Sequence, residues 1–350
     1  MTRRVFAASL AFATTRPMTP ASNSSAAGFT SIPGVEVGHF TDTRRPTGCT
    51  AIVFRKGAVA GVDVRGAAPG TRDTELLNPV NTVQQIHAIM LSGGSAYGLE
   101  TASGAMRYLE EQGIGFHLGN QIIPIVPAAI LYDLPVGVSH GNEHVRPDAA
   151  AGYAACKAAS NGPVAEGSIG AGAGATIGKY FGPRSMMKSG IGSAGMTIGN
   201  TGIIVAAIVA VNAVGDIRDP ATGRIIAGAR KPDGSGFIDT MARLREGHSA
   251  TIESGSNTTI GVVATNAIFD KAQMTKIAQM AHDGLARAVN PVHTTMDGDT
   301  IFAASIGAAK APMDHGVIGA IAAEVMTEAV LRAVKLATGL PGIPAYRDLR

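Results

Sequence analysis

The chain has 350 residues, of which 45% are hydrophobic and only 16% charged, so it is long enough for one large or two ordinary domains and should bury much of its surface within or between subunits. Its formal charge of +3 comes without a basic cluster or interleaved aromatic residues, which argues against nucleic-acid binding. The 45 glycines, beside 6 tyrosines and no tryptophan, indicate close backbone packing more than an aromatic core.

The first 31 residues differ in character from the rest. Arg3 and Arg4 precede a modestly apolar stretch, and no acidic residue occurs before Glu36. This pattern is typical of a secretory signal or a transit peptide, but the early Arg16 and the prolines after it fit an ordinary disordered extension equally well. We expect a cytoplasmic protein, or a periplasmic or secreted one if this segment is a signal. No later stretch reaches the ~20 apolar residues that a membrane-spanning helix needs.

Short strands alternate with turns in the next part of the chain. Alternating apolar and polar residues predict strands at 33–39, 50–54 and 62–66. A further strand at 87–91 runs into a glycine-rich turn at 92–98, after which a helix is expected. The order of strand, glycine turn and helix invites comparison with the nucleophile elbow of serine hydrolases.

Ser95 would be the nucleophile of such an elbow. The GxSxG pattern requires a glycine two residues after the serine, and Tyr97 occupies that position instead. We interpret the glycines as permitting a tight turn. A serine hydrolase that uses Ser95 remains an alternative function.

A predicted Ala-rich helix at 148–160 is followed by a glycine run that ends at Lys179. Tyr180 stands where a phosphate loop needs Ser or Thr, which argues against nucleotide binding. Lys179 is then either solvated or directed into a site.

The pattern of residues 201–214 predicts a long strand buried on both faces. Asn212, near its end, either caps a turn or donates to a ligand, because a buried amide without a partner is costly.

A polar segment leads directly into an apolar, β-branched run at residue 258, so Thr258 lies where a loop becomes a strand. Such a junction is usually structural. Alternatively, the protein itself cleaves the peptide bond between Asn257 and Thr258 and so makes Thr258 an N-terminal nucleophile. The freed α-amine, with a pKa near ~8, would supply the base that a weakly nucleophilic hydroxyl needs.

Beyond Thr258 the pattern predicts strand, helix, strand and helix, with the helices at 271–289 and 313–338 and a short amphipathic helix upstream at 236–247. A polar turn between the two long helices carries Asp297 and Asp299 on either side of a glycine. These carboxylates form either an acidic β-turn or a pair that orients a threonine nucleophile by accepting hydrogen bonds.

The sequence predicts neither a metal site nor a cofactor. Its nine histidines show no metal-ligand spacing. Cys49 and Cys156 are far apart and form no CxxC motif, which leaves a single structural disulfide as the open alternative.

Four motifs in order are far more specific than any one of them. They lie at residues 92–100, 211–215, 257–260 and 293–300. Together they resemble the L-aminopeptidase/D-esterase family of N-terminal-nucleophile hydrolases, which includes β-peptidyl aminopeptidases and endo-type hydrolases of 6-aminohexanoate (nylon) oligomers. The resemblance implies an α/β fold built as a four-layer αββα sandwich. It also implies an inactive precursor, 32–350 as a single hydrolase domain, and fragments 1–257 and 258–350 that stay together and form homo-oligomers, often tetramers.

The resemblance also implies roles for particular residues. Thr258 would be the nucleophile, and Asn212 would help to stabilise the oxyanion. The other positions match a lysine near the nucleophile, a tyrosine that lines the site and two carboxylates; they are Lys179, Tyr132, Asp297 and Asp299. The aminopeptidase branch uses serine as nucleophile and has a different pair in place of the two aspartates, so we expect a broader amidase of peptides or oligoamides. The alternative from another class is a non-catalytic, glycine-rich binding or assembly protein in which Thr258 is structural.

Overall fold

The computed structural model describes residues 27–249, 255–309 and 311–349. Of the signal or extension predicted for residues 1–31, residues 1–26 lie outside these ranges. Residues 29–31 were predicted to belong to this N-terminal segment. They form the 3₁₀ helix η1 (Phe29–Ser31), in which Phe29 is fully buried. The folded part therefore begins earlier than predicted.

Two sheets share one long strand, β2 (Thr47–Val64). The C-terminal half of β2 pairs with β16 (Thr300–Ser305), and this first sheet continues through β14 (Thr258–Thr265) and β11 (Ile204–Asn212) to the edge strand β10 (Ile191–Thr197). Within this first sheet, β14 and β16 are the neighbours that run parallel, and the other described pairs are antiparallel.

The N-terminal half of β2 belongs to the second sheet. It lies between β1 (Val35–Asp42) and β4 (Ile86–Ser92), and the sheet ends with β7 (Ala128–Ile130) and β3 (Thr71–Arg72). The prediction of two separate strands at 50–54 and 62–66 is wrong, because both belong to β2. The pairing of β2 with β4 is irregular between residues 53 and 58, and such irregularities let a strand bend from one sheet into another.

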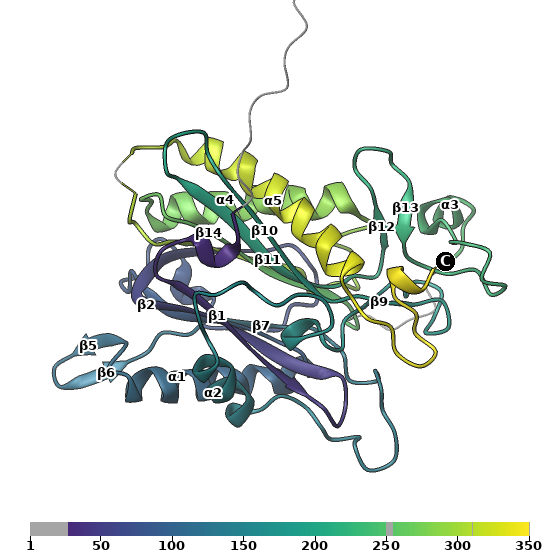
Figure 1. The fold of residues 1–350 in the computed structure, drawn as a ribbon, viewed down its shortest axis with the longest axis horizontal. Helices are drawn as coiled ribbons and strands as arrows, with labels where there is room; N and C mark the ends of the chain where they lie inside the picture. Colours follow the sequence, from purple (N-terminus) through teal and green to yellow (C-terminus); the bar gives the residue numbers. More distant parts are fainter. Residues whose placement is uncertain (1–26, 250–254, 310, 350) are drawn as a thin grey trace, which may run out of the picture.

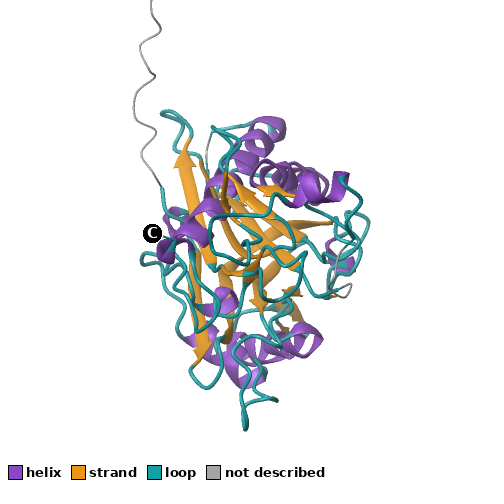
Figure 2. Cartoon of the chain, turned by 90° about the vertical axis from the view of Figure 1, so that its right-hand side faces the viewer, coloured by secondary structure: helices purple, strands orange, loops and turns teal. Residues whose placement is uncertain are grey.

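A pair of helices covers the outer face of each sheet (Figure 1). Helices α4 (Lys271–Ala288) and α5 (His315–Lys335) pack on the first sheet, and α1 (Thr101–Glu111) and α2 (Ala149–Lys157) pack on the second. Figure 2 shows the strands enclosed between these two helical layers. The order of layers is the predicted αββα sandwich.

Alternation along the central strands explains the layers. In β11 and β14, Val209 and Val263 face α4 and α5, whereas Ile208 and Val262 face the second sheet. A third apolar cluster lies between the second sheet and α1 with α2. The predicted strand at 201–214 is therefore found as the shorter β11, which is buried on both faces, whereas residues 201 and 202 are exposed before it begins.

The short helix α3 (Thr240–Arg245) covers only part of the predicted 236–247. The carboxylate of Asp239 accepts a hydrogen bond from the Ala242 N–H at 3.0 Å, so the helix is capped there. The remaining elements form small sheets and single 3₁₀ turns: β5 (Phe116–Leu118), β6 (Gln121–Ile123), β8 (Thr176–Ile177), β9 (Met187–Lys188), β12 (Asp216–Arg218), β13 (Ile225–Ala227), β15 (Val289–Asn290), η2 (Glu75–Leu77), η3 (Ser95–Glu100), η4 (Gly170–Gly172) and η5 (Tyr346–Asp348).

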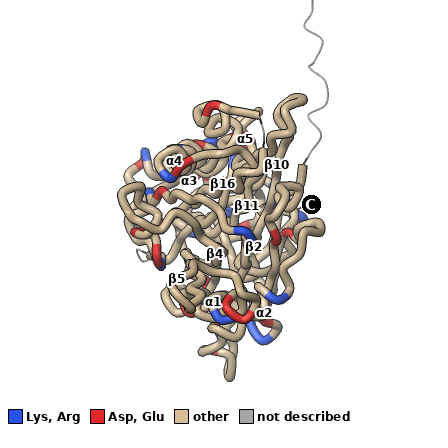
Figure 3. Tube along the Cα trace, turned by 90° about the vertical axis from the view of Figure 1, so that its left-hand side faces the viewer, with Lys and Arg blue, Asp and Glu red and all other residues tan. Residues whose placement is uncertain are grey.

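On the side of the molecule shown in Figure 3, basic and acidic segments are interspersed among uncharged ones, without a continuous basic band. Among the helices of the described ranges, none is both long and apolar enough to cross a membrane.

Candidate active site

The ends of three neighbouring strands bring most of the predicted site residues together. β14 begins at Thr258, and its antiparallel pairing with β11 places Asn212 opposite Thr258. On the other side β14 runs parallel to β16, and Asn257 pairs with Asp297 just before these two strands begin. The start of β14, the end of β11 and the start of β16 therefore meet at one edge of the first sheet.

The peptide bond between Asn257 and Thr258 is buried and surrounded by hydrogen bonds. Thr258 is 2% exposed, and its Oγ1 donates to the carbonyl oxygen of Asn257. The Gly298 N–H donates to the same oxygen at 3.0 Å. On the other side of the bond, the Thr259 N–H donates to Asp299 Oδ1 at 2.7 Å. The hydroxyl thus lies against the carbonyl group of the residue before it, and that carbonyl has a second donor.

Lys179 points into the site. Its Nζ donates to Asn212 Oδ1 at 2.8 Å, to the Asn212 carbonyl at 3.2 Å and to the Ser256 carbonyl at 3.4 Å. Burial lowers the pKa of Lys179 to about 7, although the carboxylates of Asp297 and Asp133 act to raise it. Of the two alternatives for this lysine, solvated or directed into a site, the structure supports the second.

The side-chain amide of Asn212 is bonded at both ends. Its Oδ1 also accepts from the Thr176 N–H at 3.0 Å, and its Nδ2 donates to the Tyr132 carbonyl at 3.1 Å. Tyr132 therefore contacts the site through its main-chain carbonyl, which accepts this hydrogen bond. Its phenol makes no hydrogen bond within the part of the chain that the structure describes.

Asp297 and Asp299 are each 1% exposed and have separate sets of partners. Asp297 Oδ2 accepts from the Thr294 N–H at 2.9 Å and from the Thr294 hydroxyl at 2.6 Å. Asp299 Oδ2 accepts from the His293 N–H at 3.2 Å and lies 2.8 Å from His293 Nδ1. Burial and the neighbouring Asp299 charge raise the pKa of Asp297 to about 6, against the effect of Thr294 and Lys179. These carboxylates are buried and oriented, unlike those of an exposed acidic turn.

A buried ion pair supports the segment that follows Tyr132. Asp133 lies 3.3 Å from Arg45, accepts from the Thr47 hydroxyl at 2.7 Å and accepts from the Gly94 N–H at 2.9 Å. These bonds connect the glycine turn after β4 to the segment that contacts Asn212.

Ser95 opens η3 with a positive φ of 55°, and its N–H donates to the Leu131 carbonyl at 3.0 Å. Within the described ranges no histidine or carboxylate is hydrogen-bonded to the Ser95 hydroxyl. The geometry that activates a serine nucleophile is therefore not found there. Cys49 and Cys156 are both buried and free, so they form no disulfide.

Sequence reasoning missed several partners in the site. The N–H groups of Gly298 and Thr176 belong to the main chain and have no signature in the sequence. His293 was not predicted to belong to the site. Its position in the same motif as Asp297 and Asp299 could have indicated it.

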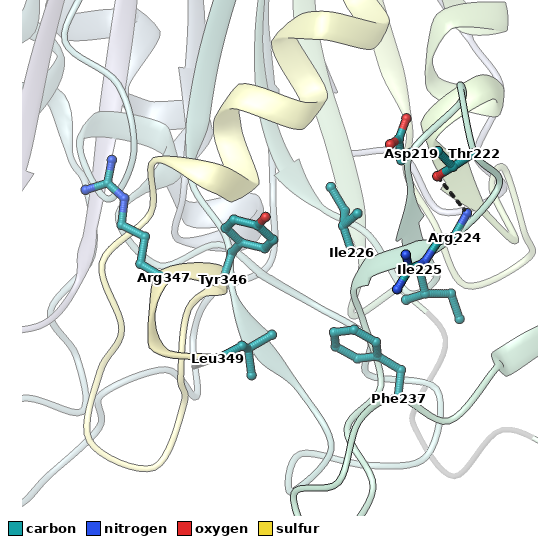
Figure 4. A pocket seen from close by; sticks show the side chains of 9 residues that line it. All are labelled: Asp219, Thr222, Arg224, Ile225, Ile226, Phe237, Tyr346, Arg347 and Leu349. Atoms are coloured by element: carbon teal, nitrogen blue, oxygen red, sulfur yellow. Dashed lines mark hydrogen bonds between the residues drawn. The ribbon is translucent and has the colours of Figure 1, made fainter.

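A surface cavity of about 780 Å³ lies between the C-terminal segment, with Tyr346 and Leu349, and the hairpin that carries Ile225 and Ile226 (Figure 4). None of the residues that line it belongs to the cluster around Thr258. The candidate active site is therefore the buried cluster and not this cavity.

Comparison with known proteins places the chain among amide and peptide hydrolases. A model of peptidase family S58 matches residues 28–346. An uncharacterized aminopeptidase of Mycobacterium tuberculosis is 40% identical over 347 residues, which cover 91% of this chain and 97% of the relative. A 6-aminohexanoate-oligomer endohydrolase of Kocuria sp. is 33% identical over 317 residues, which cover 87% and 84%.

Two similar solved structures show the fold. The L-aminopeptidase D-Ala-esterase/amidase of Ochrobactrum anthropi, described as a variant of the Ntn hydrolase fold, has a TM-score of 0.68 at 18% identity and covers 92% of both chains. A β-aminopeptidase of Burkholderia sp. has a TM-score of 0.65 at 22% identity, covering 89% of this chain and 86% of its own. From the matched family model and the relatives that align along most of its length, the chain belongs to peptidase family S58.

Proposed function

We propose that this protein is a self-processing amide hydrolase whose nucleophile is Thr258. Membership of a peptidase family supports hydrolysis of amide bonds. The observation that carries the proposal is the contact between the Thr258 hydroxyl and the carbonyl oxygen of Asn257. A hydroxyl held against the carbonyl of the preceding residue is positioned to attack its own peptide bond.

Maturation would proceed in two steps. Thr258 Oγ1 attacks the Asn257 carbonyl carbon, the bond to the Thr258 nitrogen breaks, and the nitrogen takes up the proton that the hydroxyl loses, so that an ester joins the two residues and the α-amine is free. Water then hydrolyses the ester, which leaves a carboxylate on Asn257 and restores the Thr258 hydroxyl. The Gly298 N–H faces the oxygen that becomes negatively charged in the first step, so it would act as an oxyanion donor.

In turnover, the α-amine of Thr258 would take the proton of the hydroxyl, which attacks a substrate amide. Asn212 lies opposite Thr258 and uses one Nδ2 hydrogen on the Tyr132 carbonyl, so its other Nδ2 hydrogen is available to a substrate oxyanion. We assign to Lys179 the orientation of Asn212. Tyr132 lines the site.

The two buried carboxylates would hold the new N-terminus in register. Asp299 already accepts from the Thr259 N–H, and Asp297 lies beside Asn257. The names of the relatives, aminopeptidase and 6-aminohexanoate-oligomer endohydrolase, point to peptides or oligoamides as substrates. We further propose that the cleaved fragments 1–257 and 258–350 remain together and assemble into homo-oligomers, which light scattering would measure.

The proposal is tested by hydrolysis of p-nitroanilide and oligoamide substrates. Thr258→Ala should abolish activity, because among the described residues Thr258 supplies the hydroxyl that donates to the Asn257 carbonyl. Thr259→Val is the matched control, since the neighbouring hydroxyl has no hydrogen-bond partner among the described residues. Full activity of Thr258→Ala would contradict the proposal, and labelling of Ser95 by a fluorophosphonate probe would favour the serine alternative.

A further inference from the structure

The residues before the bond between 257 and 258 occupy the place that the acyl part of a substrate must take. During self-cleavage Asn257 supplies the carbonyl group that Thr258 attacks, so its surroundings are those of an acyl group at the nucleophile. This step rests on the proposed function. The contacts of residues 255–257 therefore indicate how the site would bind the acyl part of a substrate.

Two consecutive carbonyl groups of this segment are held by the rest of the protein. The Gly298 N–H donates to the Asn257 carbonyl at 3.0 Å, and Lys179 Nζ donates to the Ser256 carbonyl at 3.4 Å. Lys179 is fixed in this position by its 2.8 Å bond to Asn212 Oδ1 and is 8% exposed. The site thus offers one donor to the attacked carbonyl and a second donor, the Lys179 amino group, to the carbonyl one residue earlier.

A third contact is specific to this chain. The Gly255 N–H donates to the Met296 carbonyl at 3.2 Å, but Gly255 has a φ of +80°, which residues with a side chain rarely adopt. A substrate with an L residue at this point would take a different path. Of the contacts to this segment, a substrate could therefore reproduce only those to the Asn257 and Ser256 carbonyls.

The side chain of Asn257 contributes little to this recognition. Its Nδ2 donates to the Ser256 hydroxyl at 3.1 Å, within the same segment, and its Oδ1 has no partner among the described residues. The protein therefore holds the main chain of the segment, and it encloses the last side chain without a hydrogen bond, since Asn257 is fully buried. The enclosed space limits the size of the residue before the scissile bond, which favours a small one such as alanine.

We propose that the mature enzyme requires an amide carbonyl one residue before the scissile bond, so that it acts within oligoamides or on N-acylated residues, and that Lys179 recognises this carbonyl. A single residue with a free amine lacks the carbonyl. It also brings an ammonium group into a buried site where burial already disfavours the charged form of Lys179.

The test compares alanine p-nitroanilide with N-acetylalanine p-nitroanilide, because the acetyl group supplies only the missing carbonyl and removes the charge. The wild-type kcat/KM should be at least about tenfold higher for the acetylated substrate, the size of one charge-assisted hydrogen bond. In Lys179→Met the ratio should fall to about one, because the donor to the acetyl carbonyl is lost. A ratio within one variant also cancels any general loss of activity. Lys276→Met, at an exposed position of α4, should keep the wild-type ratio.

The inference is overturned if the free amine is cleaved as fast as the acetylated substrate, or if Lys179→Met keeps the wild-type ratio. If Lys179→Met does not mature, the wild-type ratio of kcat/KM for the two substrates is sufficient to test the inference. A protein that cuts itself but hydrolyses neither substrate also contradicts it. A protein that stays whole and hydrolyses neither refutes the proposed function instead.

Discussion

Gly298 has no room for a side chain. A Cβ at this position would lie 2.5 Å from the Ala68 carbonyl oxygen and 2.8 Å from Thr258 Oγ1, both too close for real Cβ contacts. Gly298→Ala must therefore displace either the Ala68 main chain or the Thr258 hydroxyl. We expect self-cleavage to slow at least about tenfold, because small misplacements of reacting groups are costly.

The uncut fraction on a denaturing gel, followed over time, measures this effect. Gly28→Ala is the control, since among the described residues a Cβ there would meet the Ser31 hydroxyl at an ordinary distance of 3.7 Å. Gly298→Ala maturing at the rate of this control would show that the close packing beside Thr258 does not matter.

Lys179 makes the stability of the uncut protein depend on pH. Burial lowers its pKa from 10.5 to about 7, so between these values the unfolded chain binds a proton that the folded chain has lost. Stability from this group is therefore full above pH 10.5 and is lost as the pH falls towards 7. Burial also lowers the pKa of Lys188 to about 7, so Lys188 contributes over the same window.

We expect Lys179→Met, in the uncut Thr258→Ala protein, to reduce the rise in unfolding free energy between pH 7 and pH 10, because the variant lacks this titrating group. Urea unfolding of both proteins at the two pH values measures this. An unchanged rise would mean that Lys179 titrates as an ordinary exposed lysine.

At the scale of the elements, α1 and α2 touch through glycine. A Cβ on Gly104 would lie 1.7 Å from the Ala149 carbonyl oxygen, and one on Gly152 would lie 1.9 Å from the Thr101 carbonyl oxygen. Gly104→Ala should force the helices apart and destabilise the protein by roughly 2 kcal/mol or more. Self-cleavage should persist in the folded fraction, because β14 lies in the other sheet.

Thermal unfolding of the uncut Thr258→Ala protein, with and without Gly104→Ala, measures this loss. Glu110→Ala is the control because Glu110 is exposed on α1. Equal melting temperatures for the Gly104 and Glu110 variants would contradict the close helix contact.

Periodicity predicted the central elements well because tertiary packing and local pattern agree there. The helices α4 and α5 and the strands β11 and β14 lie close to their predicted bounds. The strand β2 was divided in two because Arg55 and Lys56 interrupt its apolar pattern. In the structure these two residues are exposed where β2 passes from one sheet to the other, so the polar interruption marks a bend and not a turn.

At the scale of the molecule, the site depends on the order of the strands. The resemblance named Thr258, Asn212 and Lys179, but the sequence cannot say that β11, β14 and β16 are neighbours whose ends meet. The buried pair of Arg45 and Asp133 was missed for a similar reason, since charged residues are usually exposed and only the fold shows which are enclosed.

The same strand order places the start of β14 inside the sandwich, where a free N-terminus can arise only if the bond before Thr258 is broken. The intact mass of the purified protein, measured under denaturing conditions, tests this directly. We predict two fragments, one that ends at Asn257 and one of residues 258–350 with Thr258 at its N-terminus, and a single chain for Thr258→Ala. A wild-type protein that hydrolyses amides as one uncut chain would contradict the assignment of Thr258.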